Sequence, residues 1–361
     1  MKKIAFRLHQ IAGLLCSVTI MIALITGALL IFENELTELF NPQRYQIGEI
    51  QDSPPMDYNK LVSELSLETG ETVRRITVRP EQTDTWILET AESPKVRYYF
   101  NPYTGKIVER FEYGSSFFFK VMALHRWLFV NPAGKTIMGV SCILFTLILI
   151  SGLWLWIPYS RKGLKSKLTF KKNAGKKRKL YDWHVVLGFY LLPVLLLMSV
   201  TGPTWSFPWY RTMLLNICGG ESMPGSMKKG GEMQGDTKSL TDEEWSNTLA
   251  YVKGLPAFRE ATLDLEGNPE KEDAIIGISV NPRNAVSHKV RESYTYHSQD
   301  QEEIKSSRWS DMNHTTRLRY WFYALHTGSF GGLLTKWIYL FVCLFAASLP
   351  ITGFLWWKNK R

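Results

Sequence analysis

Cysteine is scarce in this chain, and its arrangement does not indicate disulfide chemistry. The 361 residues include four cysteines. Cys16, Cys142 and Cys343 fall within apolar stretches, where a thiol usually behaves as a small hydrophobic group, and Cys218 stands apart from them. We therefore expect no disulfide framework and assign the cysteines no chemistry.

Two further absences narrow the classes of function. The chain has no G-x-G-x-x-G fingerprint of the kind that binds a nicotinamide or flavin dinucleotide. Residues 161–179 contain ten Lys or Arg and no Asp or Glu, which is typical of the cytoplasmic flank of a membrane helix. We read much of the net charge of +10 as such anchoring charge, and we expect no nucleic-acid partner.

Apolar residues are concentrated in four stretches, although the mean hydropathy of the whole chain is only -0.12. The stretches cover residues 11–32, 136–157, 185–205 and 333–357, here named TM1 to TM4. Each is close to or above the roughly 20 residues that a helix needs to cross a bilayer. A signal peptide is the alternative for TM1, but the apolar run is long for a signal core and lacks a small-residue cleavage pattern. We predict an integral membrane α-helical protein with four transmembrane helices.

The basic residues also predict an orientation. Lysine and arginine flank the start of TM1, fill the loop between TM2 and TM3, and follow TM4. Because cytoplasmic loops are enriched in these residues, we expect both termini in the cytoplasm and two large loops in the periplasm, with the protein in a bacterial inner membrane. The expected segments are TM1 (1–34), a periplasmic domain (35–117), an outer interfacial segment with TM2 (118–158), a cytoplasmic loop (159–180), TM3 (181–206), a second periplasmic domain (207–318), and an outer segment with TM4 and the cytoplasmic tail (319–361).

Each outer region has the pattern of a small α+β domain. The first combines a predicted helix at 58–67 with strand-like runs at 73–78, 85–88, 96–100 and 106–108. The second combines a helix at 242–255 with runs at 275–280, 290–297 and 303–309. Residues 219–235 hold three methionines, whose thioethers suit Cu(I), but we favour a flexible Gly-rich linker there.

The chain repeats itself. TM1 matches TM3 at a separation of 175 residues, and TM2 matches TM4 at 201. The first match pairs His9 with His184, Gly13 with Gly188, Thr26 with Thr201 and Gly27 with Gly202; the second pairs His125 with His326, Cys142 with Cys343, Ser151 with Thr352, Gly152 with Gly353 and Trp156 with Trp357. We expect two copies of a helix–domain–helix unit related by a pseudo-twofold axis along the membrane normal.

Such an axis would set like histidines opposite one another. His9 would face His184 near the inner surface, and His125 would face His326 near the outer surface. Two neutral imidazoles suit the two axial positions of a haem iron, and this ligation favours electron transfer. The hypothesis is therefore two bis-histidine haem b groups, and it requires that the members of each pair face each other.

Other residues have supporting roles in this hypothesis. Gly13 and Gly188 lie one helical turn beyond a histidine, where they would let the porphyrin approach the backbone. Glycines 27 and 202 would flank the outer macrocycle, and glycines 152 and 353 the inner one. Arg126 is a candidate partner of a haem propionate, or an ordinary interfacial anchor. The alternatives are interfacial histidines and glycines that serve helix packing. His288, His297 and His314 have no repeat counterpart, and we interpret them as surface residues.

The motifs R-L-H-x-x-x-G at 7–13, A-L-H at 123–125 and 324–326, and F-N-P-Y-T-G at 100–105 resemble those of the PepSY-associated transmembrane helix proteins. The resemblance covers almost the whole chain. It implies that the four paired histidines are haem ligands and that the outer domains are PepSY modules. It also implies a ferric reductase that acts on a ferric siderophore or another Fe(III) chelate. The second module departs from the pattern, because His297-Ser298-Gln299-Asp300-Gln301 replaces the Asn-Pro-Tyr-Thr-Gly turn.

Other functions remain open at this stage. The outer domains could be binding modules that regulate a periplasmic peptidase, with the helices as a membrane anchor. A metal transporter is disfavoured, because the middle of the spans offers only Thr, Ser and Cys as polar groups. The sequence identifies no catalytic residue, and it leaves the electron donor as a membrane quinol or a cytoplasmic reductase.

Overall fold

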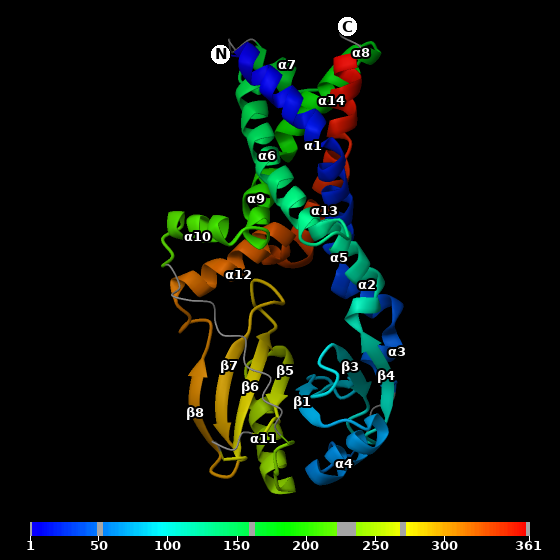
Figure 1. The fold of residues 1–361 in the computed structure, drawn as a ribbon, viewed down its shortest axis with the longest axis vertical. Helices are drawn as coiled ribbons and strands as arrows, with labels where there is room; N and C mark the ends of the chain where they lie inside the picture. The colour runs from blue at the N-terminus through cyan, green and yellow to red at the C-terminus, as the bar shows by residue number, and fades with distance from the viewer. Residues whose placement is uncertain (1, 49–52, 159–162, 222–235, 268–271, 359–361) are drawn as a thin grey trace. The chain divides into compact units, whose positions relative to one another are not determined.

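The computed structural model describes residues 2–48, 53–158, 163–221, 236–267 and 272–358. It divides into two compact units. The helical unit comprises Met1–Glu33, Phe117–Ser222 and Trp321–Arg361, and the sheet unit comprises Asn34–Ser116 and Met223–Tyr320. Figure 1 labels the elements of both units.

Four segments of the helical unit are long and apolar enough to cross a membrane, as the sequence predicted. The first is α1 (Lys2–Leu30) and the second is α6 (Ala133–Trp156). The third, Lys176–Trp205, joins α8 (Lys176–Asp182), a π-helical turn (Trp183–Leu187), α9 (Gly188–Thr201) and a 3-10 turn (Gly202–Trp205). The fourth, Ser329–Lys358, contains α13 (Gly332–Ala346) and α14 (Leu349–Lys358). The chain is therefore a membrane protein.

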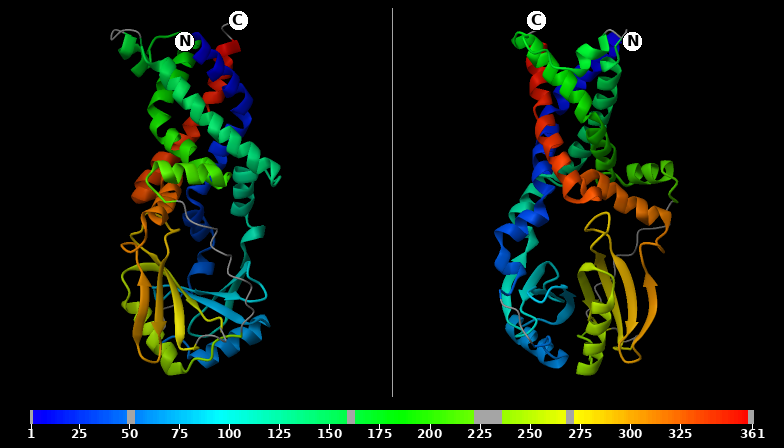
Figure 2. Two further views of the ribbon diagram at one scale, coloured as in Figure 1. Left: turned by 60° about the vertical axis from the view of Figure 1, so that its left-hand side comes forward. Right: turned by 180° about the vertical axis from the view of Figure 1, so that it is seen from behind.

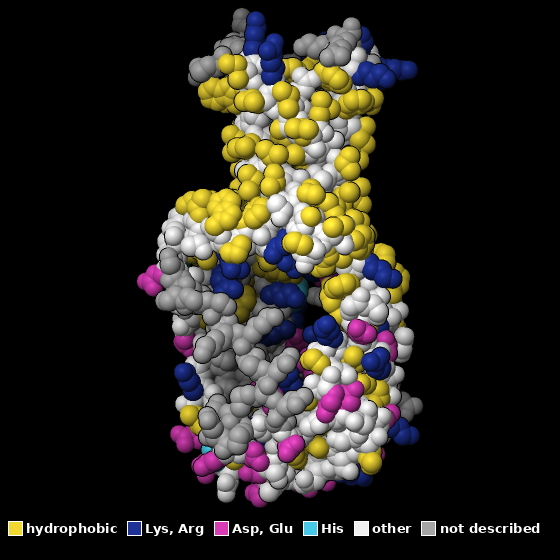
Figure 3. All heavy atoms as spheres, in the orientation of Figure 1, with side chains coloured by type: hydrophobic (Ala, Val, Ile, Leu, Met, Phe, Trp, Pro, Cys, Tyr) yellow, Lys and Arg dark blue, Asp and Glu magenta, His cyan; other side chains and the backbone are white. Residues whose placement is uncertain are grey.

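The packing of the helical unit suits a lipid surrounding. Its core is made of small and aliphatic side chains from several spans, among them Cys16, Leu24, Leu195 and Cys343. Many other apolar side chains on the spans remain exposed, and Figure 3 shows them covering the visible face of this unit. Lysine and arginine gather at the end that holds both termini. Since lipid tails are as apolar as these side chains, such exposure carries no cost in a bilayer.

Shorter helices flank the spans. In the helical unit, α5 (Phe117–Trp127) precedes α6, α7 (Leu164–Leu168) lies between the second and third spans, and α10 (Pro208–Ile217) follows the third. The helix α12 (His314–Thr327) precedes the fourth span. In the sheet unit, α2 (Glu33–Phe40) and α3 (Pro42–Tyr45) lead towards the sheet.

The sheet unit contains one antiparallel sheet of eight strands in the order β4-β3-β2-β1-β5-β6-β7-β8. The strands are β1 (Val73–Val78), β2 (Trp86–Thr90), β3 (Val96–Phe100), β4 (Ile107–Glu112), β5 (Phe258–Asp264), β6 (Ile275–Pro282), β7 (Glu292–His297) and β8 (Glu302–Ser307). The helices α4 (Tyr58–Thr69) and α11 (Asp242–Gly254) pack on its core and contact each other (Figure 2).

The pairing of β1 with β5 differs from the sequence-based expectation. We expected separate α+β domains, but Ile76 of β1 lies opposite Leu263 of β5, so the two regions share one sheet. The strand β5 itself was not predicted. Its inward residues Phe258, Ala261 and Leu263 are buried, but Arg259 and Glu260 interrupt the apolar pattern that marks a strand in sequence.

The methionines of residues 219–235 lie at positions 223, 227 and 233, outside the described residues.

Candidate functional site

The four repeated histidines lie in two close pairs within the helical unit. The ring centroids of His9 and His184 are 6.2 Å apart, with an angle of 89° between the ring planes. Those of His125 and His326 are 6.3 Å apart, with an angle of 64°. The first pair comes from α1 and the π-helical turn of the third span, and the second comes from α5 and α12. These are the two pairs that the repeat predicted.

The Nδ1 atom of each histidine in the first pair is anchored on a facing helix. It lies within hydrogen-bond distance of a backbone carbonyl oxygen and of the hydroxyl oxygen three residues further on. The distances are 3.0 Å to Ile148 and 3.1 Å to Ser151 for His9, and 3.1 Å to Leu349 and 3.3 Å to Thr352 for His184. Because a carbonyl oxygen only accepts, Nδ1 is the donor, and Nε2 is left with a lone pair.

The second pair is anchored in the same way. Thr26 Oγ1 lies 2.9 Å from His125 Nδ1 and donates its own proton to the Ile22 carbonyl oxygen, so the threonine oxygen accepts from the ring. His326 Nδ1 lies 3.0 Å from the Met198 carbonyl oxygen and 3.2 Å from Thr201 Oγ1. All four imidazoles therefore have the same tautomer, with Nε2 unprotonated. A hydrogen bond that fixes the tautomer and orientation of a ligand is usual around metal-binding histidines.

Glycine lets each ring lie against the helix that anchors it. A methyl group added at these glycines would approach the histidine Cε1 atom closely. The distances are 3.1 Å from Gly152 to His9, 3.0 Å from Gly353 to His184, 3.4 Å from Gly27 to His125, and 3.3 Å from Gly202 to His326. Gly152 and Gly353 therefore permit the position of the inner rings, whereas a methyl at Gly27 would make an ordinary contact with His125. A methyl at Gly202 would meet Cys142 Sγ first, at 2.7 Å.

Gly13 and Gly188 have a different place. A methyl group on Gly13 would meet no atom within 4 Å, and one on Gly188 would meet only Leu349, at 3.9 Å. Both glycines line a cavity of about 350 Å³ beside His9 and His184. Cavities for small molecules and cofactors commonly measure about 300–1,000 Å³. The open space over these glycines thus belongs to a cavity of the size that a cofactor needs.

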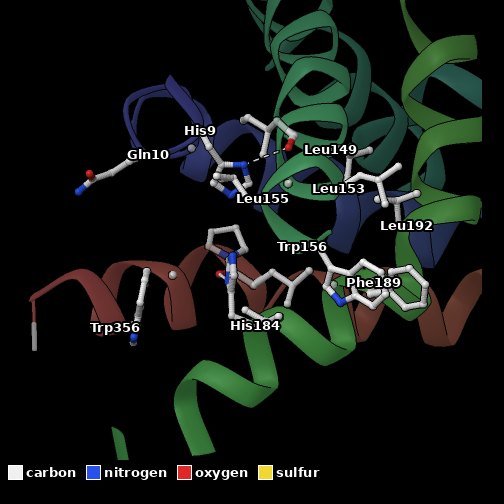
Figure 4. Close-up of a pocket in the computed structure, with 18 of the residues that line it drawn as sticks. His9, Gln10, Leu149, Leu153, Leu155, Trp156, His184, Phe189, Leu192 and Trp356 are labelled. Atoms are coloured by element: carbon white, nitrogen blue, oxygen red, sulfur yellow. Dashed lines mark hydrogen bonds between the residues drawn. The ribbon is translucent and has the colours of Figure 1, made fainter. Parts of the chain in front are cut away.

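The cavity is lined by side chains from all four spans, and its lining is mainly apolar. In Figure 4 the rings of His9 and His184 extend towards each other from opposite sides of it. The indole of Trp156 stacks on the ring of Phe189 at 3.8 Å, and Figure 4 shows this stack beside the histidines. The cavity therefore offers two imidazole nitrogens within a mainly apolar space.

Burial keeps the second pair neutral. It lowers the pKa of His125 to about 4, with a smaller contribution from the nearby His326, and it lowers the pKa of His326 to about 4. A neutral imidazole is the form that binds a metal ion. Trp205 encloses this pair further, with its ring centroid 5.1 Å from that of His326.

The spacing of both pairs suits a single metal ion between the rings. An imidazole nitrogen binds a transition metal at about 2.0–2.1 Å and lies about 1.1 Å from its ring centroid, so two rings on opposite sides of one metal have centroids about 6.3 Å apart. Among the described residues, no group of three His, Cys, Asp or Glu side chains could hold a metal ion. Each pair presents two imidazole nitrogens, which is the number of protein ligands that a six-coordinate haem iron would take.

The remaining candidates are residues other than the four paired histidines and their glycines. Arg126 is exposed, and its guanidinium lies 5.5 Å from the ring centroid of the adjacent Trp127. His314 is exposed, as expected, whereas His288 is partly buried. His297 is also more buried than predicted, and its ring nitrogens lie 3.3 Å from Glu272 and 3.4 Å from Asp300. None of the four cysteines forms a disulfide, as predicted.

Sequence reasoning did not identify the groups that bind the histidine Nδ1 atoms. The repeat contained the signal, because Thr26 matches Thr201 and Ser151 matches Thr352, each directly before a matched glycine. In both halves of the chain, a Ser-Gly or Thr-Gly pair lies at the same expected membrane depth as a histidine of another helix. This pattern could have predicted the arrangement.

Comparison with known proteins gives one family. A family model described as the PepSY-associated TM region matches residues 6–360, which is essentially the whole chain. The comparison with curated proteins gave no match.

Proposed function

The chain belongs to the family of the PepSY-associated TM region, and from this premise we propose that it is a di-haem electron-transfer protein of the membrane. His9 with His184 would hold one haem b, and His125 with His326 the other. The observation that carries the proposal is the ring spacing of 6.2 and 6.3 Å together with four Nδ1 atoms anchored on other helices. When bound, the haem irons would supply one-electron redox chemistry without an open coordination position.

The residues around each pair fit this role. Ser151 and Thr352 help to orient the inner imidazoles, and Thr26 and Thr201 do the same for the outer ones. Gly152 and Gly353 leave room for the inner rings beside the helices that anchor them, and the lining of the inner cavity is mainly apolar. Ligand orientation and exclusion of solvent are two means by which a protein sets the potential of a haem.

We further propose that the two halves of the chain form a pseudo-twofold repeat. Equivalent hydroxyls, carbonyls and glycines contact equivalent histidines in both halves. The strand order β4-β3-β2-β1-β5-β6-β7-β8 is likewise symmetric about the β1–β5 junction. With the basic end of the helical unit in the cytoplasm, the His9 pair would lie near the inner surface of a bacterial inner membrane. The sheet unit would then be periplasmic.

The proposed reaction is reduction of an Fe(III) chelate, such as a ferric siderophore, at the periplasmic surface. One electron would enter near His9 and His184, supplied by a quinol or a cytoplasmic reductase, and would leave near His125 and His326. Gain of that electron converts Fe(III) to Fe(II), which hard oxygen ligands hold less tightly. The choice of an iron chelate depends on the family resemblance, whereas the choice of electron transfer depends on the histidine geometry.

The test is the absorption spectrum of the full-length protein purified from haem-replete cells. A reduced-minus-oxidised spectrum with low-spin b-type bands, at about two haems per chain, would support the proposal. A colourless protein would contradict it and would favour the rival function, a membrane-anchored PepSY module that regulates a periplasmic peptidase.

Two variants then separate the sites. His125→Ala should lose one haem per chain and the reduction of an added Fe(III) chelate, while the haem between His9 and His184 remains. His297→Ala, a matched control in the sheet unit, should keep both haems. Full chelate reduction in the His125→Ala protein would contradict the proposed electron path.

A further inference from the structure

The cavity beside His9 and His184 has two chemically different ends. Towards the middle of the spans it is lined by apolar side chains, namely Ile20, Phe145, Leu192 and Ala346. The other end is lined by Phe6, Tyr181, Trp356 and Lys167, of which Phe6 and Trp356 are near the two chain termini in sequence. Among the lining residues that the structure describes, Lys167 is the one lysine or arginine. Positive charge is therefore confined to one end of an otherwise apolar space.

Hydrogen bonds to the last turn of α6 fix the position of Lys167. Its Nζ donates to the carbonyl oxygens of Leu155, at 3.2 Å, and Trp156, at 2.6 Å. In return the Trp156 indole nitrogen donates to the Lys167 carbonyl oxygen at 3.2 Å. The lysine side chain is thereby held at the edge of the cavity.

The ammonium of Lys167 has the capacity to bind an anion as well. An ammonium carries three N–H donors, and two of them account for the bonds to Leu155 and Trp156. Both acceptors are uncharged carbonyl groups. Burial lowers the pKa of Lys167, and the nearby charge of Lys2 lowers it further. A carboxylate at this end of the cavity would offset both effects.

We propose that Lys167 binds the propionate carboxylates of the inner haem and so determines which edge of the macrocycle faces the termini. The inference deepens the proposed function and rests on it. Haem b has an apolar edge with vinyl and methyl groups and an opposite edge with two carboxylates, and the cavity has the same polarity from end to end. A charge-assisted hydrogen bond between ammonium and carboxylate is among the stronger polar interactions in proteins.

A purely structural role for Lys167 is the rival explanation. Lysine near the C-terminal end of a helix is favourable in itself, because it interacts with the helix dipole and the last carbonyl groups. The test must therefore detect the carboxylates, and haem b dimethyl ester serves this purpose. It keeps the iron and the macrocycle of haem b but carries no propionate charge.

The experiment compares the affinities of the two compounds. Haem-free full-length protein with His125→Ala, which retains the inner pair, is titrated with haem b and with the dimethyl ester, and low-spin absorbance is recorded. We expect haem b to bind about tenfold more tightly or better, a ratio that Lys167→Met should reduce to about one. Lys165→Met, an exposed lysine of the same helix, should leave the ratio unchanged, and Lys167→Arg should restore it.

The outcomes are distinguishable. Equal affinity for haem b and the ester in the protein with Lys167, or an unchanged preference in Lys167→Met, would overturn the carboxylate site and leave the inner haem in place. Absence of a low-spin spectrum with either compound, in protein that is folded by circular dichroism, would overturn the proposed function and this inference with it.

Discussion

Replacement of Gly353 by alanine tests whether the position of His184 matters to a bound group. The added methyl would lie 3.0 Å from His184 Cε1 and 3.3 Å from Nδ1. Carbon atoms without a bond between them prefer about 3.5–4.0 Å, so the ring must retreat by roughly 0.5 Å. Changes that disturb the orientation of a metal ligand typically cost about 10- to 100-fold in affinity, and we therefore expect roughly tenfold faster loss of the inner haem.

Gly27 provides the matched control. A methyl there would lie 3.4 Å from His125 Cε1, which is close to ordinary contact, so Gly27→Ala should alter retention of the outer haem by no more than about twofold. Alanine stabilises a helix by about 1 kcal/mol relative to glycine, so neither variant should weaken its helix.

Haem transfer from each purified variant to an excess of apomyoglobin gives the rates, and potentiometric titration identifies which haem is lost. The reasoning would be refuted if Gly353→Ala retained its haem like the unaltered protein, or if Gly27→Ala lost haem the faster of the two.

Three further predictions concern other parts of the chain. Thr201→Val leaves one acceptor for the anchored Nδ1 in the outer pair and should weaken outer haem retention by about tenfold, measured by the same transfer assay. Arg44→Met removes a buried guanidinium paired with a carboxylate at 2.6 Å and should lower the free energy of unfolding by about 3 kcal/mol, against less than about 1 kcal/mol for the exposed Arg283→Met. Equal losses in chemical denaturation would contradict the burial argument. Hydrogen bonds from Ser306 and, to a smaller extent, Tyr251 lower the pKa of Glu303 below its ordinary value of 4.5. The ionised carboxylate therefore stabilises the folded protein above pH 4.5, and this stabilisation is lost as the pH falls through the pKa of Glu303 in the folded state. Glu303→Gln should therefore make acid unfolding of the sheet less steep below about pH 5, and an unchanged slope would exclude this contribution.

The parts of the fold that sequence predicts best are those governed by one strong physical requirement. The four spans must be apolar over about 20 residues to satisfy their backbone in lipid, and all four were found where predicted. Helix α1 begins at Lys2, before its apolar run, because a helix can continue into the polar surroundings. The π-helical turn around His184 depends on contacts with neighbouring spans and was not visible in the sequence.

The sheet was harder to predict because its centre depends on pairing between distant segments. Strand β5 was missed, and the β1–β5 pairing that joins the two outer regions was not anticipated. Residues of β1 and β5 that face each other, such as Thr77 and Thr262, have no periodic signature in either segment alone. Edge strands and central strands can both show alternating polar and apolar residues. The local pattern therefore does not reveal which strands pair with each other.

The candidate site falls between these cases. Comparison of the two halves of the chain identified the four histidines and their partners, because a repeat converts sequence separation into geometry. The sequence did not predict the hydroxyls and carbonyls that anchor the Nδ1 atoms. Nor did it predict the closeness of Gly152 and Gly353 to the rings. Their position depends on how far each span is rotated, and the sequence pattern leaves that rotation open by a large fraction of a turn.

The central claim is that each histidine pair holds one haem iron between two imidazoles. Low-temperature electron paramagnetic resonance of the oxidised, purified protein tests it most directly. The ring planes meet at 89° in the inner pair and 64° in the outer pair, and imidazoles that are close to perpendicular spread the g values of low-spin ferric haem widely. The account predicts two strongly anisotropic low-spin signals, with His125→Ala removing one of them. A protein that shows only high-spin ferric haem, or no haem signal, would contradict it.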